Sequence, residues 1–276
     1  MSQPAVRTAT RDELETMLGW ARTEGWNPGL DDADLFYAAD PGGFHVATVG
    51  EVVVGTMSLV RYGNGCGFLG LYIVHPEFRG RGYGRALWDF VLAAQSLHSI
   101  GLDGVVAQQA NYAASGFAFS HRNLRFAVSD LKFEAEPEDD EPVSGEILDA
   151  LKLSFPAPRN GFNKLWWAHP RHVRAVKRRD GRIAGLGVAR RCTVGWKIGP
   201  LMAHDELSAD HVFRRLAAAA QGQQVVLDVP EPNAAAIRLA ERYGMKVVFE
   251  TARMVRGTFP LHDLAPLYGV TTLELG

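Results

Sequence analysis

The sequence FLGLYIVHPEFRGRGYGRALWDF, residues 68–90, carries the clearest structural pattern in this chain. Its first seven residues are almost all apolar, which is typical of a central strand covered on both faces. Its last part begins a helix, in which Leu87, Phe90 and Val91 share one face. Between the two lies a loop with alternating glycines. The segment therefore predicts a buried strand, a short glycine-rich loop and an amphipathic helix.

The glycine-rich loop is suited to binding a phosphate or a pyrophosphate. Backbone amides at the start of a helix have no internal partner, and the helix dipole adds partial positive charge there. Glycines let a ligand approach the main chain, and arginines add cationic side chains. A turn that is rich in glycine only for packing is the alternative. The residues expected to hold the phosphate are Arg79, Gly80, Arg81, Gly82, Tyr83, Gly84 and Arg85.

The spacing of the loop distinguishes among phosphate ligands. Arg85 stands where a dinucleotide-binding fingerprint needs its third glycine, and no GxxxxGK[ST] motif occurs. The spacing Arg79-x-x-Gly82-x-Gly84 instead resembles the acyl-CoA signature of the GNAT N-acetyltransferase superfamily. That resemblance implies an α/β fold built on a mixed sheet, with loop amides on the CoA pyrophosphate. It also implies that Ile73 and Val74 bind the pantetheine arm through their backbone.

A second match to the same superfamily lies downstream. Tyr112 stands four residues before the pair Gly116-Phe117, as the general-acid tyrosine often does in GNAT enzymes. The resemblance implies that Tyr112 protonates the departing CoA thiolate, which a phenol can do because it is neutral at pH 7. A core tyrosine is the alternative reading. Val105 departs from the pattern, since many relatives have asparagine there.

The rest of the first half alternates strands and helices, which favours an α/β layer fold. Thr10 and Glu13 form a capping box at the start of a helix, and the helix should end by the Trp26-Asn27-Pro28-Gly29 stretch. The other expected strands are 6–8, 44–49, 52–61, 104–107 and 117–128, and the other expected helices are 31–39 and 108–115.

After an acidic stretch, the pattern begins again. Residues 134–144 include six carboxylates and two prolines, so we expect an exposed linker. Beyond it, the order of elements resembles a diverged copy of the first half. The expected elements are helices at 145–153 and 208–220 and one opened by Pro232, with strands at 172–179, 183–203, 225–229 and 246–255.

The second copy lacks the chemistry of the first. Ala240 occupies the tyrosine position, and residues 199–206 read GPLMAHDE where the glycine-rich loop should be. We therefore expect two tandem GNAT-like folds: an acyl-CoA-binding domain at 1–133, the linker at 134–144, and a degenerate domain at 145–276 that binds no CoA.

The acceptor side and the general base are less marked in the sequence. The connection after the first helix borders the acceptor pocket in GNAT folds. The central strand at 68–74 contains no acid, so His75 at its end and His121 on a later strand are the candidate bases, each with a structural role as the alternative. With Tyr112 and His75 expected in catalysis, the residues expected on the acceptor side are Trp26, Asn27, Tyr72 and His121.

Composition excludes several classes of protein. Lys and Arg number 29 against 31 Asp and Glu, so no basic excess points to nucleic acid. No apolar run reaches the ~18 residues of a membrane span, and the N-terminal residues do not resemble a signal peptide. Cys66 and Cys192 lie far apart, which suits a reducing cytoplasm. No metal-ligand motif occurs, so we expect no metal. Oligomeric state is not indicated.

Together these features predict an acyl-CoA-dependent N-acyltransferase. The expected reaction is transfer of acetyl from acetyl-CoA to a primary amine of a small molecule, by direct attack in a ternary complex. A non-catalytic acyl-CoA sensor or interaction module is the alternative, motivated by the missing acid on the central strand and by Val105.

Overall fold

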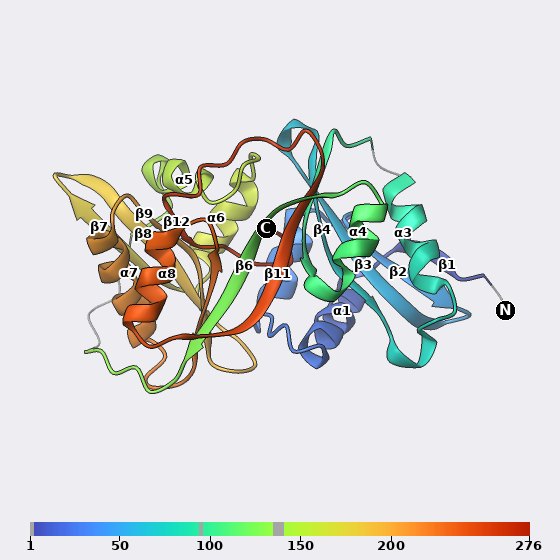
Figure 1. The fold of residues 1–276 in the computed structure, drawn as a ribbon, viewed down its shortest axis with the longest axis horizontal. Coiled ribbons are helices and arrows are strands. Elements are labelled where there is room, and N and C mark those ends of the chain that lie inside the picture. Colours follow the sequence, from blue (N-terminus) through green and yellow to red (C-terminus); the bar gives the residue numbers. More distant parts are fainter. Residues whose placement is uncertain (1–2, 94–95, 135–140) are drawn as a thin grey trace.

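The computed structural model describes residues 3–93, 96–134 and 141–276, and in these ranges the strands form one mixed sheet of twelve (Figure 1). The strand order is β1-β2-β3-β4-β5-β11-β6-β10-β9-β8-β7, with β12 paired to β9. Residues 135–140 of the expected acidic linker lie outside the described residues. The expected α/β fold with a mixed sheet is therefore confirmed, and the sheets of the two halves are continuous with each other.

The first half contains six strands and four α-helices among its described residues. They are β1 (Ala5–Thr8), α1 (Arg11–Thr23), α2 (Asp32–Ala39), β2 (Phe44–Val49), β3 (Val52–Tyr62), β4 (Cys66–Val74), α3 (Tyr83–Ala93), β5 (Ser99–Val105), α4 (Gln109–Ala114) and β6 (Ala118–Val128).

The second half repeats this order of elements. They are α5 (Gly145–Lys152), α6 (Asn160–Ala168), β7 (Val173–Arg179), β8 (Arg182–Arg191), β9 (Trp196–Ala203), α7 (Glu206–Ala218), β10 (Val225–Pro230), α8 (Ala234–Arg242), β11 (Lys246–Gly257) and β12 (Leu267–Gly269).

Helix α1 shows how local sequence sets an element. The Thr10 hydroxyl accepts a hydrogen bond from the Glu13 amide, and the Glu13 carboxylate accepts one from the Thr10 amide. This reciprocal cap begins the helix where the sequence predicts it. Leu14, Met17 and Leu18 then share the buried face of the helix.

Two predictions about elements were wrong, and one helix was missed. Residues 183–203 were expected as one strand, but a turn at Gly195 separates β8 from β9. Strand β5 begins at Ser99 rather than at 104, because pairing with β4 and β11 extends it over residues of weak strand propensity. Helix α6 was not predicted, although Trp166 and Trp167 on it are fully buried.

The two halves exchange their last long strands. Strand β6 of the first half pairs with β10 of the second, while β11 lies between β5 and β6. Figure 1 shows β6 and β11 side by side across the middle of the molecule. Buried ion pairs join the halves at this crossing, between Arg125 and Asp228 and between Arg253 and Asp103. Each half therefore depends on the other to complete its sheet.

Strands β4 and β5 separate along their length. They pair in parallel only where Cys66–Leu69 faces Ser99–Leu102. Past this point the register of β4 against β3 shifts, and Leu71 adopts a left-handed backbone with φ of 47°. The Leu71 carbonyl turns to accept a hydrogen bond from the Thr56 hydroxyl at 2.9 Å. Because the two strands diverge, backbone groups at the end of β4 are left without a strand partner on this side.

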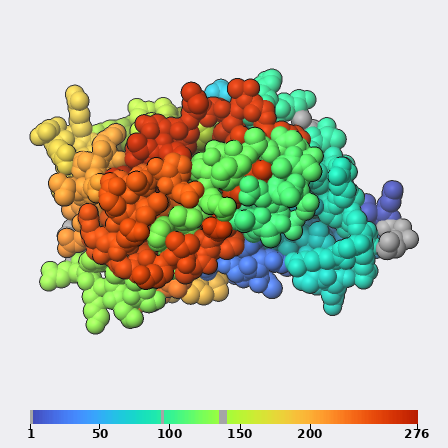
Figure 2. Space-filling view, viewed as in Figure 1, coloured from blue at the N-terminus to red at the C-terminus, as the bar shows by residue number. Residues whose placement is uncertain are grey.

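The C-terminal segment fills the matching opening in the second half. Strands β9 and β10 also pair in parallel over only three residues, and β12 then pairs with β9 while the Val270 amide donates to the Asp228 carbonyl on β10. The chain continues into the first half, where the Tyr62 hydroxyl donates to the Leu275 carbonyl at 2.8 Å. Figure 2 shows the orange and red C-terminal residues packed against the green first-half residues without a gap.

Candidate active site

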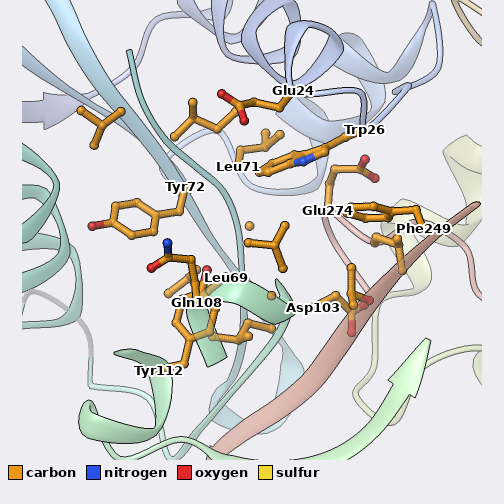
Figure 3. Close-up of a pocket in the computed structure, with 18 of the residues that line it drawn as sticks. Glu24, Trp26, Leu69, Leu71, Tyr72, Asp103, Gln108, Tyr112, Phe249 and Glu274 are labelled. Carbon is orange, nitrogen blue, oxygen red and sulfur yellow. The ribbon is translucent and has the colours of Figure 1, made fainter. Parts of the chain in front are cut away.

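A cavity of about 370 Å³ lies where β4 and β5 diverge (Figure 3). Its walls come from the connection after α1, from β4, β5, α4, β6 and β11, and from the C-terminal segment. The lining residues are Glu24, Trp26, Leu69, Gly70, Leu71, Tyr72, Ile73, Val74, Arg79, Leu102, Asp103, Gly104, Val105, Gln108, Tyr112, Arg125, Phe249, Thr251, Leu273 and Glu274. Both halves of the chain therefore build this cavity.

The structure brings together six of the residues singled out in the sequence. These cavity-lining residues are Trp26, Tyr72, Ile73, Val74, Arg79 and Tyr112. The start of α3 lies beside them, because a Cβ atom on Gly84 would stand 2.7 Å from the Tyr72 hydroxyl oxygen. The loop residues 80–85 lie outside the lining of the cavity, and so do the other three expected site residues, Asn27, His75 and His121.

The glycine-rich loop has the geometry of an anion cradle. Gly80 and Gly82 have φ of 76° and 80°, a region that glycine adopts without strain, and a Cβ atom at either position would meet nothing within 4 Å. The Ala86 amide donates the first helical bond, to the Gly82 carbonyl. The preceding amides of the loop are free for a ligand. This open, donor-rich turn fits the pyrophosphate of an acyl-CoA.

The three arginines of the loop take different positions. Arg79 donates to the Val74 carbonyl at 2.9 Å and forms an ion pair with Glu24, so it links the loop to the edge of the cavity. Arg81 lies over the Phe78 ring, with 5.3 Å between the guanidinium carbon and the ring centroid. Arg85 pairs with Asp89 one helical turn later, and all three side chains remain accessible to a phosphate.

Tyr112 is held rigidly at the floor of the cavity. Its ring stacks on Trp88 with 5.8 Å between the centroids, and it packs so closely on Gly104 that a Cβ atom there would lie 2.2 Å from the ring. Burial raises the pKa of Tyr112 to about 12, and nearby Tyr72 adds to this effect. The phenol is therefore protonated at neutral pH and can donate.

The two histidines expected as bases lie elsewhere. His75 packs between Trp20 and Phe78, with ring centroids 5.3 and 5.9 Å away. His121 is on β6 and shares a hydrogen bond with the Ser120 hydroxyl at 3.0 Å. Burial lowers the pKa of His121 to about 3, so this ring stays neutral in the physiological range.

The Trp26-Asn27 pair joins the two halves. The Asn27 side chain donates to the Val194 carbonyl and accepts from the Val194 amide, so both of its polar atoms are used on the loop between β8 and β9. Trp26 lines the cavity, and its carbonyl accepts hydrogen bonds from Arg125 at 2.7 Å and Lys197 at 3.3 Å. Arg125 on β6 of the first half and Lys197 on β9 of the second therefore hold Trp26 together.

Several cavity residues were missed in the sequence. Glu24, Asp103, Gln108, Phe249 and Glu274 all line the cavity (Figure 3), and they come from five separate parts of the chain. One local signal existed: Glu274 is the single charged residue in the apolar run 267–276. A lone acid in an apolar segment must find a partner or a function, because burial of an unpaired charge is costly.

The equivalent region of the second half is closed to a ligand. The Asp205 carboxylate accepts from the Ser208 amide at 2.9 Å and so occupies the start of α7, the counterpart of α3. Glu206 adds further negative charge there and pairs with Arg238. The opening between β9 and β10 holds β12. In this half the chain's own C-terminal segment takes the place that the cavity has in the first half.

Within the described ranges, no group of three or more His, Cys, Asp or Glu side chains is arranged to hold a metal ion. The same ranges contain no helix with the length and apolar character of a membrane span.

The splayed central strands, the glycine cradle and the tandem repeat define a GNAT-type acyltransferase. The chain belongs to the acetyltransferase (GNAT) family: the family model matches residues 11–118, and a model for an acetyltransferase (GNAT) domain matches residues 147–269. Two tandem GNAT folds, and the class of acyltransferase that uses acyl-CoA donors, are therefore confirmed.

The relatives agree with this class. Holothin acyltransferase from Pseudoalteromonas sp. strain SANK 73390 is 30% identical over 98% of this chain and 94% of its own length. A candidate acetyltransferase from Pyrococcus horikoshii matches the fold with a TM-score of 0.82, at 20% identity, over 100% of this chain and 97% of its own. A tandem GNAT protein from the clavulanic acid biosynthesis pathway has a TM-score of 0.60 at 16% identity, over 94% of this chain and 100% of its own.

Proposed function

We propose that this protein transfers an acetyl group from acetyl-CoA to a primary amine of a small molecule, by direct attack in a ternary complex. The observation that carries the proposal is the single cavity wall shared by Ile73, Val74 and Tyr112 beside the glycine cradle. In this assignment residues 1–133 bind the donor, 134–144 are the linker, and 145–276 complete the acceptor side. Full-length similarity to holothin acyltransferase supports a small-molecule acceptor.

The donor would lie along the end of β4. The amides from Gly80 to Arg85 would bind the pyrophosphate, and the backbone of Ile73 and Val74 would bind the pantetheine arm. The thioester would then lie between the diverging strands, near the phenol of Tyr112. Backbone amides at the bulge around Leu71 would polarise the thioester carbonyl as negative charge develops on its oxygen. No covalent enzyme intermediate is required.

Tyr112 would protonate sulfur as the C–S bond breaks. Its ring is already fixed by Trp88 and Gly104, so little reorganisation is needed in the transition state. Acid catalysis by one positioned group contributes about 10²–10⁴-fold. Tyr112→Phe should therefore lower kcat by that range while the Kd for acetyl-CoA, measured by calorimetry, stays within about threefold of the wild type.

Tyr37→Phe is the matched control, because Tyr37 lies on α2 and does not line the cavity. Equal kcat values for Tyr112→Phe and the wild type would remove Tyr112 from the chemistry. A wild-type protein that binds acetyl-CoA and transfers acetyl to no amine in a broad panel would be a sensor rather than an enzyme.

A further inference from the structure

We propose that Glu274, carried into the cavity by the C-terminal segment, binds the ammonium group of the acceptor and takes its proton. We propose further that the acceptor is an amine on an apolar, carboxylate-free body. This inference rests on the proposed function and names the missing base and the substrate class for that same site.

Glu274 is buried and faces the cavity. Its relative exposure is 3%, and it lines the cavity beside Leu273 (Figure 3). One carboxylate oxygen accepts from the Thr272 hydroxyl, which orients the group. Three buried cations, Arg125, Arg190 and Lys197, interact electrostatically with Glu274. Arg125 and Arg190 form their ion pairs with Asp228 and Asp32, and among the described residues no cation forms a direct ion pair with Glu274. A buried carboxylate with no paired cation can receive one from a ligand.

The other two acids of the cavity are already paired. Glu24 forms its ion pair with Arg79. Asp103 accepts two hydrogen bonds from Arg253, both at 2.7 Å, and a third from Asn123 at 2.8 Å. Each of these two carboxylates is therefore already paired with an arginine. Glu274 is the remaining carboxylate that can take a proton from the acceptor.

The cations of the cavity are paired as well. Arg79 is held by Glu24, and Arg125 by a doubly hydrogen-bonded pair with Asp228 at 2.6 and 2.8 Å. A carboxylate on the acceptor would have to break one of these pairs or be buried without a partner. Either event is costly in a desolvated site. The cavity therefore disfavours amino acids as acceptors.

The walls near Glu274 are aromatic and apolar. Trp26 and Phe249 lie on either side of it in Figure 3, and Leu71 and Leu273 line the same region. Aromatic faces bind both apolar bodies and the cationic head of an ammonium. This combination suits an arylalkylamine or a similar apolar amine.

The proposed proton path balances. Glu274 takes one proton from the R–NH₃⁺ acceptor, and the freed nitrogen lone pair forms the C–N bond with the thioester carbon. The C–S bond breaks with its electron pair on sulfur, which takes the Tyr112 proton. The second proton on nitrogen restores the Tyr112 phenol, and the proton on Glu274 leaves to solvent. The products are the amide, CoA thiol and one released proton.

The test compares paired acceptors in the full-length protein: phenethylamine with phenylalanine, and tryptamine with tryptophan. We expect kcat/KM for each amine to exceed that of its amino acid by at least about tenfold. Equal values, or a preference for the amino acids, would overturn the substrate class. Failure of the wild type to acylate any amine would overturn the proposed function itself, and with it this inference.

The role of Glu274 is tested with Glu274→Gln on the better amine. We expect kcat/KM at pH 7 to fall by about 10²–10⁴-fold, with the Kd for acetyl-CoA unchanged. Activity of the variant should then rise about tenfold per pH unit toward the pKa of the amine, because only the fraction already neutral can react. A purely structural role would not produce this pH profile.

Two further variants keep the result interpretable. Glu231→Gln removes a carboxylate from the exposed turn after β10, outside the cavity, and should match the wild type. Glu274→Asp retains the charge and should recover part of the activity if the glutamine variant folds poorly. A Glu274→Gln protein with wild-type kcat/KM and an unchanged pH profile would refute the role of Glu274 while leaving the transferase function intact.

Discussion

Replacing Gly70 with alanine should cost most of the activity, although it adds one methyl group. Gly70 lies on β4 and faces the C-terminal segment, and a Cβ atom there would stand 2.1 Å from the Glu274 carbonyl oxygen. Its φ is not in the left-handed region, so alanine brings no backbone strain of its own. The expected effect is therefore purely a displacement of the segment.

The size of the effect follows from that distance. An ordinary van der Waals separation is 3.4 Å or more, so Glu274 must move by about 1.3 Å. Misplacing a reacting group by ~1 Å can cost about 10²-fold in rate. We expect kcat to fall about 100-fold, equivalent to ~2.7 kcal/mol in the activation barrier. The Kd for acetyl-CoA should change little, because the backbone of Ile73 and Val74 lies beyond the contact.

The assay is steady-state release of CoA thiol with the best amine, with calorimetry for donor binding. Gly55→Ala on the neighbouring β3 is the matched control, since a Cβ atom there meets its nearest neighbour at an ordinary 3.6 Å. Deleting residues 274–276 removes the contact and the carboxylate together. The deletion and the Gly70→Ala change should be non-additive in a double-mutant cycle, because both act through Glu274.

Wild-type kcat in Gly70→Ala would show that the C-terminal segment can shift without consequence for the chemistry, which contradicts a catalytic role for its position. Full additivity with the deletion would show instead that Gly70 acts through the donor site.

Three further predictions concern binding and stability. In calorimetry the wild type should bind acetyl-CoA at one site per chain, and Gly82→Glu should abolish this binding. Glycine is required there because its φ is 80° and because a side chain would obstruct the loop amides. A second site in the wild type, or a site retained in the variant, would contradict this prediction. Arg125→Met should lower the free energy of unfolding by about 3–5 kcal/mol, because it leaves buried Asp228 unpaired. In urea melts the double variant Arg125→Met/Asp228→Leu should recover part of this lost stability. A double variant less stable than Arg125→Met would contradict a stabilising role for the ion pair. Burial lowers the pKa of His172 to about 3 from 6.5, so the unfolded chain binds this proton first as the pH falls. The contribution of His172 to the free energy of unfolding is complete above pH 6.5 and is lost toward pH 3, by up to ~1.4 kcal/mol per pH unit. His172→Gln should flatten the pH dependence of the free energy of unfolding, measured in unfolding curves across this range. An unchanged pH dependence would mean that other groups dominate it.

Much of the fold could be predicted because it is encoded locally. The capping box at Thr10 and the apolar run of β4 act within a few residues, and the structure has both where they were expected. The placement of Tyr112 beside the end of β4 follows the same local order of strand, loop and helix. The turn at Gly195 was missed because strand-forming apolar residues lie on both sides of it.

The acceptor side could not be predicted, because it is built from segments far apart in the chain. Phe249 reaches the cavity only through the exchange of β6 and β11, which no local pattern signals. Asn27 shows the converse: it lies in the expected loop, but its amide is used to join the halves.

Local sequence specifies the strand, loop and helix of the first half: a buried strand, a glycine-rich loop and a tyrosine, all set by backbone propensity and hydrophobic periodicity within about 50 residues. The position of the C-terminal segment, which brings Glu274 into the first half, follows from long-range packing. The physical reason is that an apolar segment of ten residues has no preferred place until the openings between β4 and β5 and between β9 and β10 exist. The C-terminal segment fills the opening between β9 and β10, and the opening between β4 and β5 holds the cavity.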